Sequence, residues 1–174
     1  MPQLSKNLLK EMNKQIQEEM FSAWLYYAMS AYFESENLPG FGHWMRAQAM
    51  EEVTHGQKFF THIHERGGKV ELLDIKKPQA TWDSPTAAFE DALNHEYHIT
   101  SRIHHLMKIA RDEGDFAAEM GILNWFVDEQ IEEEVSVGEV LDKLNLIEGN
   151  KNGLYMLDKE MAARVFTPTA TMTW

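Results

Sequence analysis

The sequence contains no cysteine and no long hydrophobic run. Without cysteine, disulfides, rubredoxin-type iron sites, zinc fingers and thiol catalysis are all excluded. No stretch of about 18 apolar residues that could span a membrane is present, and the N-terminus leads directly into an amphipathic segment without a signal-peptide core. We therefore expect a cytoplasmic protein with no membrane partner, whose polar chemistry rests mainly on oxygen ligands.

Basic residues are also scarce relative to acidic ones. The chain has 16 Lys and Arg against 28 Asp and Glu, a formal net charge of −12. The basic residues are scattered, and a phosphate backbone needs a basic face, so we expect no nucleic-acid partner. An acidic balance serves solubility in many proteins, and it also suits a protein that gathers cations. With 174 residues and 44% apolar content, residues 1–174 are expected to form a single domain.

Apolar residues recur at steps of three and four in four long segments, as on one face of a helix. These stripes predict helices near 5–34, 41–67, 85–112 and 116–145, which make a bundle over about 5–145, then a short helix near 152–164 and a tail over 165–174. Ser5 and Ser84 are the expected N-caps of the first and third helices. Residues 69–84 show neither the helix nor the strand period, so they are expected to cross the length of the bundle.

Each predicted helix carries polar residues halfway along its apolar stripe. From the first helix to the fourth, these residues are Glu19; Gln48, Glu52 and His55; Glu96; and Gln130 and Glu133. The fourth stripe is expected to begin at Phe116 and Glu119 and to continue through Leu123 and Phe126. Counted from the turns at Asn37 and Gly114, the acids lie 15–19 residues along their helices, which places them at one level, roughly 25 Å from the turns. Unpaired buried carboxylates cost several kcal/mol each, so four of them in one core predict two divalent cations between them.

The spacing of Glu52 and His55 places both side chains on one face of a helix, one turn apart, where they can reach the same metal ion. Di-metal helix bundles use one Glu from each of two helices and a Glu-x-x-His pair from each of the other two. The fourth helix has Gln130 and Glu133 in place of the second pair. The second metal is therefore expected to lack an imidazole and to be held more weakly.

Taken together, these motifs resemble those of the non-haem ferritins of bacteria and archaea. The resemblance covers residues 5–164 and rests on QEEMFSAWLYYAMSAYF, RAQAMEEVTH, NHEYHIT, NWFVDEQIEEE and LYMLDKE. It implies an all-α, ferritin-like four-helix bundle with one long crossover and a short fifth C-terminal helix. It also implies an iron-storage protein with ferroxidase activity. In that family two Fe(II) ions per centre are oxidised by dioxygen or hydrogen peroxide, and the ferric product is stored as a mineral in a hollow homo-oligomer, here expected to have 24 subunits.

The same resemblance implies a role for each site residue. The first iron would be bound by Glu19, Glu52 and His55, with Glu52 bridging to the second. The second iron would be bound by Glu96 and Glu133, with Gln130 beside it. A third iron site would map to Glu51, Glu129, Glu132 and Glu133. Tyr26 matches the family's tyrosine next to the centre, where it would donate an electron or a hydrogen bond.

At two places the sequence differs from related proteins, and these differences concern haem binding and the route by which iron enters. Haem-binding relatives have Met after the bridging Glu and His at the end of the fourth-helix motif, whereas Val53 and Glu133 stand here, so no haem is expected. Met120 and Leu123 stand where animal ferritins have acidic channel residues, so we expect no acidic three-fold iron route of that kind.

Two other functions remain open. A soluble di-iron oxidase or peroxide-detoxifying protein would use the same ligands without storing mineral. A catalytically silent shell subunit would contribute only cavity surface. The fifth helix and the acids of the third site favour storage over the first alternative, and the ligand set, complete apart from Gln130, disfavours the second.

Overall fold

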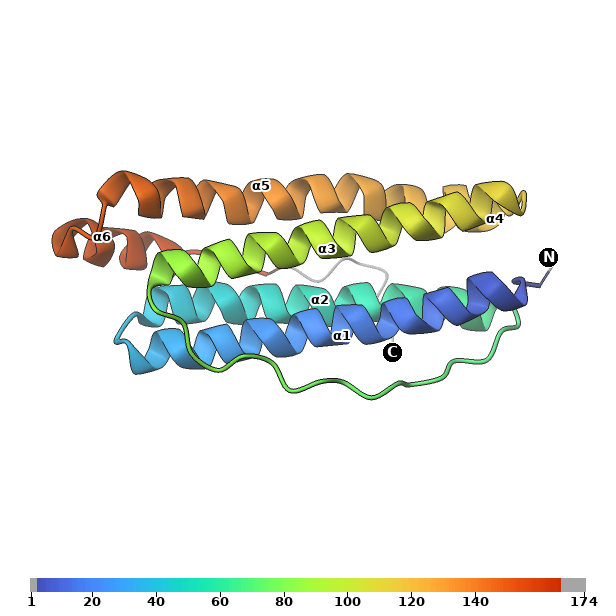
Figure 1. Ribbon diagram of the computed structural model, residues 1–174, viewed down its shortest axis with the longest axis horizontal. Helices are drawn as coiled ribbons and strands as arrows, with labels where there is room; N and C mark the ends of the chain where they lie inside the picture. Colours follow the sequence, from blue (N-terminus) through green and yellow to red (C-terminus); the bar gives the residue numbers. More distant parts are fainter. Residues whose placement is uncertain (1–2, 167–174) are drawn as a thin grey trace.

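The computed structural model describes residues 3–166, and within that range every regular element is a helix. Three rods are single helices: α1 (Lys6–Ser35), α2 (Pro39–Glu65) and α3 (Pro85–Asp112). The fourth rod is continuous and consists of α4 (Phe116–Ala118), the π-helical segment η1 (Glu119–Leu123) and α5 (Asn124–Ile147). The short helix α6 (Lys151–Met161) lies at the end of the bundle where α1 turns into α2 (Figure 1). The all-α four-helix bundle with a short additional helix is confirmed.

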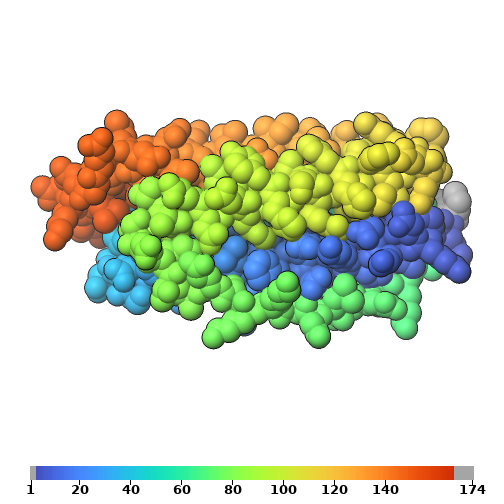
Figure 2. Space-filling view, viewed as in Figure 1, coloured from blue at the N-terminus to red at the C-terminus, as the bar shows by residue number. Residues whose placement is uncertain are grey.

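The rods form two antiparallel hairpins joined by a long connection. α1 pairs with α2, α3 pairs with α5, and α1 also packs along α3. Residues 69–82 contain no regular structure and run the length of the bundle, which confirms the predicted crossover (Figure 1). The side chain of Asn13 binds this segment at both Lys69 O (3.2 Å) and Glu71 N (2.7 Å). The crossover is therefore fixed along α1, where Figure 2 shows it as a separate ridge.

Two helix starts have the N-caps that the sequence predicts, and the start of α2 is capped differently. Ser5 Oγ accepts from Leu8 N at 3.0 Å, and Ser84 Oγ accepts from Ala87 N at 3.1 Å, so both predicted N-caps are confirmed. α2 begins at Pro39 rather than residue 41, and its own N-cap residue makes no side-chain hydrogen bond. Its first amides instead donate to Asp158, which α6 brings from the far end of the sequence.

The fourth rod departs from the predicted stripe in its first turns. Phe116 is 73% exposed and Glu119 is only partly buried, whereas Ala118 and Ile122 face the core. The prediction that Phe116 and Glu119 face the core was wrong because η1 adds an extra residue per turn, which rotates everything before it relative to a uniform helix. From Leu123 onward the predicted stripe is buried as expected.

The last predicted elements are only partly described. α6 spans Lys151–Met161, against a predicted helix near 152–164. Of the predicted tail, 165–174, residues 167–174 lie outside the described part of the chain. No helix within residues 3–166 combines the length and apolarity that crossing a bilayer requires.

The buried apolar side chains form two clusters separated by a polar layer. In one cluster the rings of Phe33 and Phe41 stack with centroids 5.1 Å apart, and in the other Phe59 and Phe126 stack at 4.4 Å. On α1 the layer is marked by Glu19, which lies between the two clusters along the helix. Each rod is thus held by apolar packing on both sides of its polar residues, which fixes where those residues can point.

Candidate metal centre

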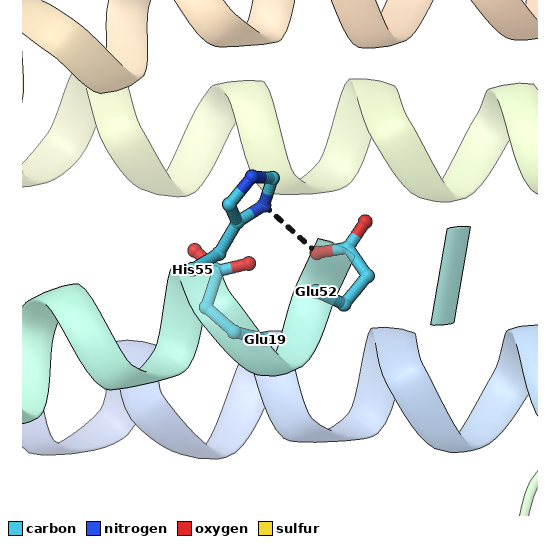
Figure 3. A group of neighbouring side chains, drawn as sticks. All are labelled: Glu19, Glu52 and His55. Carbon is cyan, nitrogen blue, oxygen red and sulfur yellow. Dashed lines mark hydrogen bonds and ion pairs between the residues drawn. The ribbon is translucent and has the colours of Figure 1, made fainter. Parts of the chain in front are cut away.

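The polar residues that interrupt the apolar stripes meet in one buried layer. The ligand candidates in this layer are each at most 4% exposed: Glu19, Glu52, His55, Glu96, Gln130 and Glu133. One comes from α1, two from α2, one from α3 and two from α5. Figure 3 shows the α1 carboxylate of Glu19 beside Glu52 and His55 of α2. The expectation that all four helices contribute at one level is therefore met by the geometry.

Three overlapping groups of side chains place their ligand atoms within 4.8 Å of one another. These groups are Glu19, Glu52 and His55; Glu52, Glu96 and Glu133; and His55, Glu129 and Glu133. The carboxylate of Glu52 belongs to the first two groups, so its two oxygens can serve neighbouring metal ions. The donor set is mainly carboxylate with one imidazole, which suits iron and other borderline-to-hard divalent cations.

Amide groups hold one oxygen of two of these carboxylates. Gln15 Nε2 donates to Glu19 Oε1 at 3.0 Å, and Gln48 Nε2 donates to Glu133 Oε2 at 2.5 Å. The second oxygen of each carboxylate, Glu19 Oε2 and Glu133 Oε1, is buried without a hydrogen-bond partner. Buried acceptors are normally satisfied, so these two oxygens are free for a ligand that the protein itself does not supply.

Glu96 is held at both oxygens. The hydroxyl of Tyr26 donates to Oε1, and the amide nitrogen of Gln130 lies 3.3 Å from Oε2. The same amide also lies 3.3 Å from the hydroxyl of Thr100. Tyr26 and Gln130 therefore contact the centre as expected, although both do so through Glu96.

Burial and mutual repulsion change the acidity of the carboxyl groups. Burial, and then the charge of Glu52, raise the pKa of Glu19 to about 8, and the same two causes raise the pKa of Glu96 to about 8. Burial and the charges of Glu52 and Glu96 raise the pKa of Glu133 well above its ordinary value. In the absence of a cation these groups tend to keep protons, and a bound divalent ion would displace them.

His55 lies between acids on two sides. Its Nδ1 is 3.2 Å from Glu52 Oε2 and its Nε2 is 3.4 Å from Glu129 Oε1. Burial by itself would lower the pKa of His55, but hydrogen bonds to Glu129 and Glu52 outweigh it and raise the pKa well above its ordinary value. A proton on this ring therefore takes the place of a metal charge, and metal binding must release it.

The four acids expected to form a third site are not all gathered. Glu129 and Glu133 share a group with His55. The carboxylate of Glu51 instead lies 2.8 Å from the guanidinium of Arg164, and Glu132 is exposed. Within residues 3–166 neither Glu51 nor Glu132 belongs to a group of ligand atoms within 4.8 Å.

Two amide residues orient the ligands, and sequence reasoning missed Gln15 and placed Gln48 in the polar layer without giving it a role. Gln15 precedes Glu19 by four residues, and Gln48 precedes Glu52 by four, a spacing that brings side chains together on a helix face. An amide one turn before a buried acid is therefore a signal that could have identified both. Arg164 offered no such signal, because its partner lies 113 residues away.

Comparison with known proteins found relatives that match nearly the whole chain. The family model described as Ferritin-like domain matches residues 9–147. A bacterial non-heme ferritin of Staphylococcus aureus is 40% identical over 163 residues, which cover 94% of this chain and 98% of that protein. A bacterial non-heme ferritin of Staphylococcus epidermidis is also 40% identical over the same length.

The similar solved structures are also ferritins. An open-pore ferritin from the archaeon Archaeoglobus fulgidus has a TM-score of 0.92 and 44% identity, covering 93% of this chain and 99% of its own. A humanized archaeal ferritin has a TM-score of 0.93 and 47% identity, covering 95% and 99% respectively. Fold, buried carboxylate centre and sequence similarity over nearly the whole chain agree, and this chain belongs to the ferritin family.

Proposed function

We propose that this chain is the ferroxidase subunit of an iron-storage protein. It binds two Fe(II) ions between its four rods, and their two electrons reduce one dioxygen molecule, with two protons, to hydrogen peroxide. The Fe(III) product is stored as a hydrated mineral inside a hollow shell. The observation that carries this proposal is that Glu52 belongs to two ligand groups at once, each within 4.8 Å. A shared carboxylate keeps two metal ions close enough to react with one oxidant molecule.

The ligand roles follow from the groups. Glu19, Glu52 and His55 bind the first iron. Glu52, Glu96 and Glu133 bind the second iron, with Gln130 beside it. Hard carboxylate ligands favour Fe(III) over Fe(II), so the ligand set itself assists oxidation. Tyr26 donates a hydrogen bond to Glu96 and stands where it can also give up an electron.

A third iron site lies beside the centre in this proposal. Glu51, Glu129, Glu132 and Glu133 supply its carboxylates. The group of His55, Glu129 and Glu133 supports it, because Glu133 also belongs to the second-iron group. Glu129 is partly exposed and Glu132 is exposed, so this side of the centre leads from the buried layer toward the surface. Iron at this position would be on its way out of the centre.

The storage role requires an assembly of several chains. We propose a cytoplasmic shell of 24 subunits. Large apolar side chains that a single chain leaves exposed support contacts between copies, among them Tyr155 (60%) and Met156 (66%) on α6. The crossover and α1 also expose apolar groups, including Trp24 at 54%. A di-iron oxidase that works as a small species would not need such surfaces.

Aerobic addition of Fe(II) to the purified protein tests this function. Stopped-flow absorbance should show fast oxidation, and sizing should show a large particle that retains many irons per chain. Glu52→Ala should remove the fast phase because the bridge is lost, while Glu132→Ala should change mainly later turnover. Glu139→Ala, an exposed acid on α5, is the matched control. A small species that holds only two irons would indicate the oxidase alternative, and a shell that oxidises no faster than buffer would indicate a silent subunit.

A further inference from the structure

The chain beyond α6 returns to α2 and brings a positive charge to the edge of the metal centre. Arg164, three residues after the end of α6, places Nη2 at 2.8 Å from Glu51 Oε2. Its guanidinium lies over the ring of Trp44, 4.1 Å from the centroid. Its backbone oxygen accepts a hydrogen bond of 2.8 Å from His43 Nε2. Three separate contacts thus hold Arg164 against α2.

One terminal nitrogen of the Arg164 guanidinium has no hydrogen-bond partner. Its side chain is 18% exposed and that of Glu51 is 27% exposed, so the pair is partly removed from water. The second terminal nitrogen, Nη1, is buried without a hydrogen-bond partner. An unsatisfied buried donor on a charged group is unfavourable, so the arrangement is one that a better cation can displace.

Glu51 is partly buried among other acidic side chains, so a nearby positive charge stabilises its ionised form. Burial raises the pKa of Glu51, and the charge of Arg164 is the largest influence opposing that rise. Nearby Glu52 and Glu129 add repulsion. Glu51 directly precedes Glu52 on α2, yet it stands outside the group formed by His55, Glu129 and Glu133. Its carboxylate is engaged by Arg164 instead.

We propose that Arg164 competes with the third iron for Glu51. In this view the guanidinium neutralises Glu51 until iron arrives, and it must move aside before Glu51 can become a ligand. Because the cation is tethered, it lowers the affinity of the third site without affecting the first two. Iron then passes through that position rather than remaining there. This inference rests on the proposed function, since it assumes that iron uses a third site.

Titration calorimetry with Zn(II), which is redox-inert, tests the competition on the assembled full-length protein. Arg164→Gln removes the charge and should raise the affinity of the third Zn(II) per chain about fivefold to tenfold, as expected for loss of a partly buried charged hydrogen bond. The first two equivalents should be unchanged. Arg46→Gln is the matched control, because Arg46 of α2 also pairs with a carboxylate, that of Glu34 on α1 at 2.7 Å, in an exposed ion pair.

A second variant connects the effect to Glu51. Glu51→Gln should weaken the third equivalent, and adding Arg164→Gln to it should then have no further effect on affinity. A crystal soaked in Zn(II) should show Glu51 turned away from Arg164 toward the metal. An unchanged or weaker third site in Arg164→Gln overturns the proposal, as does a filled third site with the Arg164–Glu51 pair intact.

If sizing shows that Arg164→Gln does not assemble, Arg164→Lys provides a second comparison. Arg164→Lys keeps the charge but offers a single nitrogen, so the third-site affinity should rise by about twofold. An affinity equal to or below that of the unmodified protein overturns the proposal in this variant also. Failure of the proposed function would give a different result, because the unmodified protein would then not bind the first two Zn(II) equivalents.

Discussion

Gln15 holds one oxygen of the Glu19 carboxylate at 3.0 Å, while the other oxygen of that carboxylate has no hydrogen-bond partner. Gln15 is itself held, because Arg102 Nε donates to its amide oxygen at 3.3 Å. Arg102 in turn pairs with Glu11 at 3.0 Å. A chain of contacts across α1 and α3 therefore fixes the direction in which the free oxygen of Glu19 points.

Gln15→Leu should weaken binding at the first metal position. Leucine fills a similar volume but cannot donate, so Glu19 loses its fixed orientation. Loss of such an outer contact costs about tenfold to a hundredfold in metal affinity. Zn(II) calorimetry measures the change. Gln17→Leu is the control, because Gln17 lies on the same helix but donates to the backbone oxygen of Asp74 in the crossover. Equal affinities in the two variants would contradict the orienting role.

Tyr26→Phe should weaken the second metal position in a pH-dependent way. The Tyr26 hydroxyl lowers the pKa of Glu96, which burial and Glu52 raise to about 8. Without the hydroxyl, Glu96 keeps its proton to a higher pH, so Zn(II) affinity at pH 7 should fall by about threefold to tenfold, the scale of the net contribution of one typical hydrogen bond. The loss should diminish at pH 9. Tyr27→Phe, an exposed neighbour, is the control, and a loss independent of pH would count against this explanation.

The metal-free protein should become less stable as the pH rises. The folded chain keeps protons on Glu19 and Glu96 up to about pH 8, whereas the unfolded chain loses them near the ordinary value of 4.5. The folded state therefore binds more protons between these values, and the free energy of unfolding falls as the pH increases through that window. The raised pKa of His55 acts in the same direction.

Thermal unfolding in the presence of a chelator measures this effect. The midpoint should be lower at pH 8 than at pH 5.5 by about 5 °C, and Zn(II) should restore it. Glu19→Gln should reduce the difference, because a neutral amide has no proton to lose. Glu139→Gln, at an exposed position on α5, should leave it unchanged. A midpoint that is constant or rises with pH in the metal-free protein would show that these carboxyl groups are not held protonated.

The polar layer could be predicted because helix periodicity determines it. Once Glu19, Glu52, Glu96 and Glu133 fall on the apolar faces of four rods at equal distance from the turns, packing leaves them only the interior. Features that depend on a change of period or on distant partners could not be predicted. A uniform stripe cannot indicate the π-helical turn that exposes Phe116.

The start of α2 is an example of a feature that depends on a distant partner. The sequence predicts a break over residues 36–40, because Pro39 and Gly40 usually interrupt helices, and no nearby side chain caps the first turn of α2. The cap comes from Asp158, 118 residues from Gly40, and α6 must dock before it is in place. A side chain built on Gly40 would come within 1.7 Å of the backbone oxygen of Asp158, so this contact also requires glycine.

Asp158→Ala should therefore destabilise the junction between α6 and α2. Asp158 Oδ1 accepts from Gly40 N at 2.8 Å and Phe41 N at 3.0 Å, and all three residues are buried. Alanine leaves two buried amide donors without a partner, at a cost of about 1–3 kcal/mol. Because Arg164 follows α6, loosening this junction should also weaken its contact with Glu51.

Denaturant unfolding and hydrogen exchange measure the two effects of Asp158→Ala separately. The free energy of unfolding should fall by the stated amount, and the amides of Gly40 and Phe41 should lose protection before those near the metal centre. Glu160→Ala is the control on the same helix, since its exposed pair with Lys143 at 2.6 Å contributes less than about 1 kcal/mol. If both variants lose the same stability, or if protection at the start of α2 persists, the α2 N-terminus does not depend on Asp158, and α6 is held chiefly by apolar residues such as Leu157 and Met161.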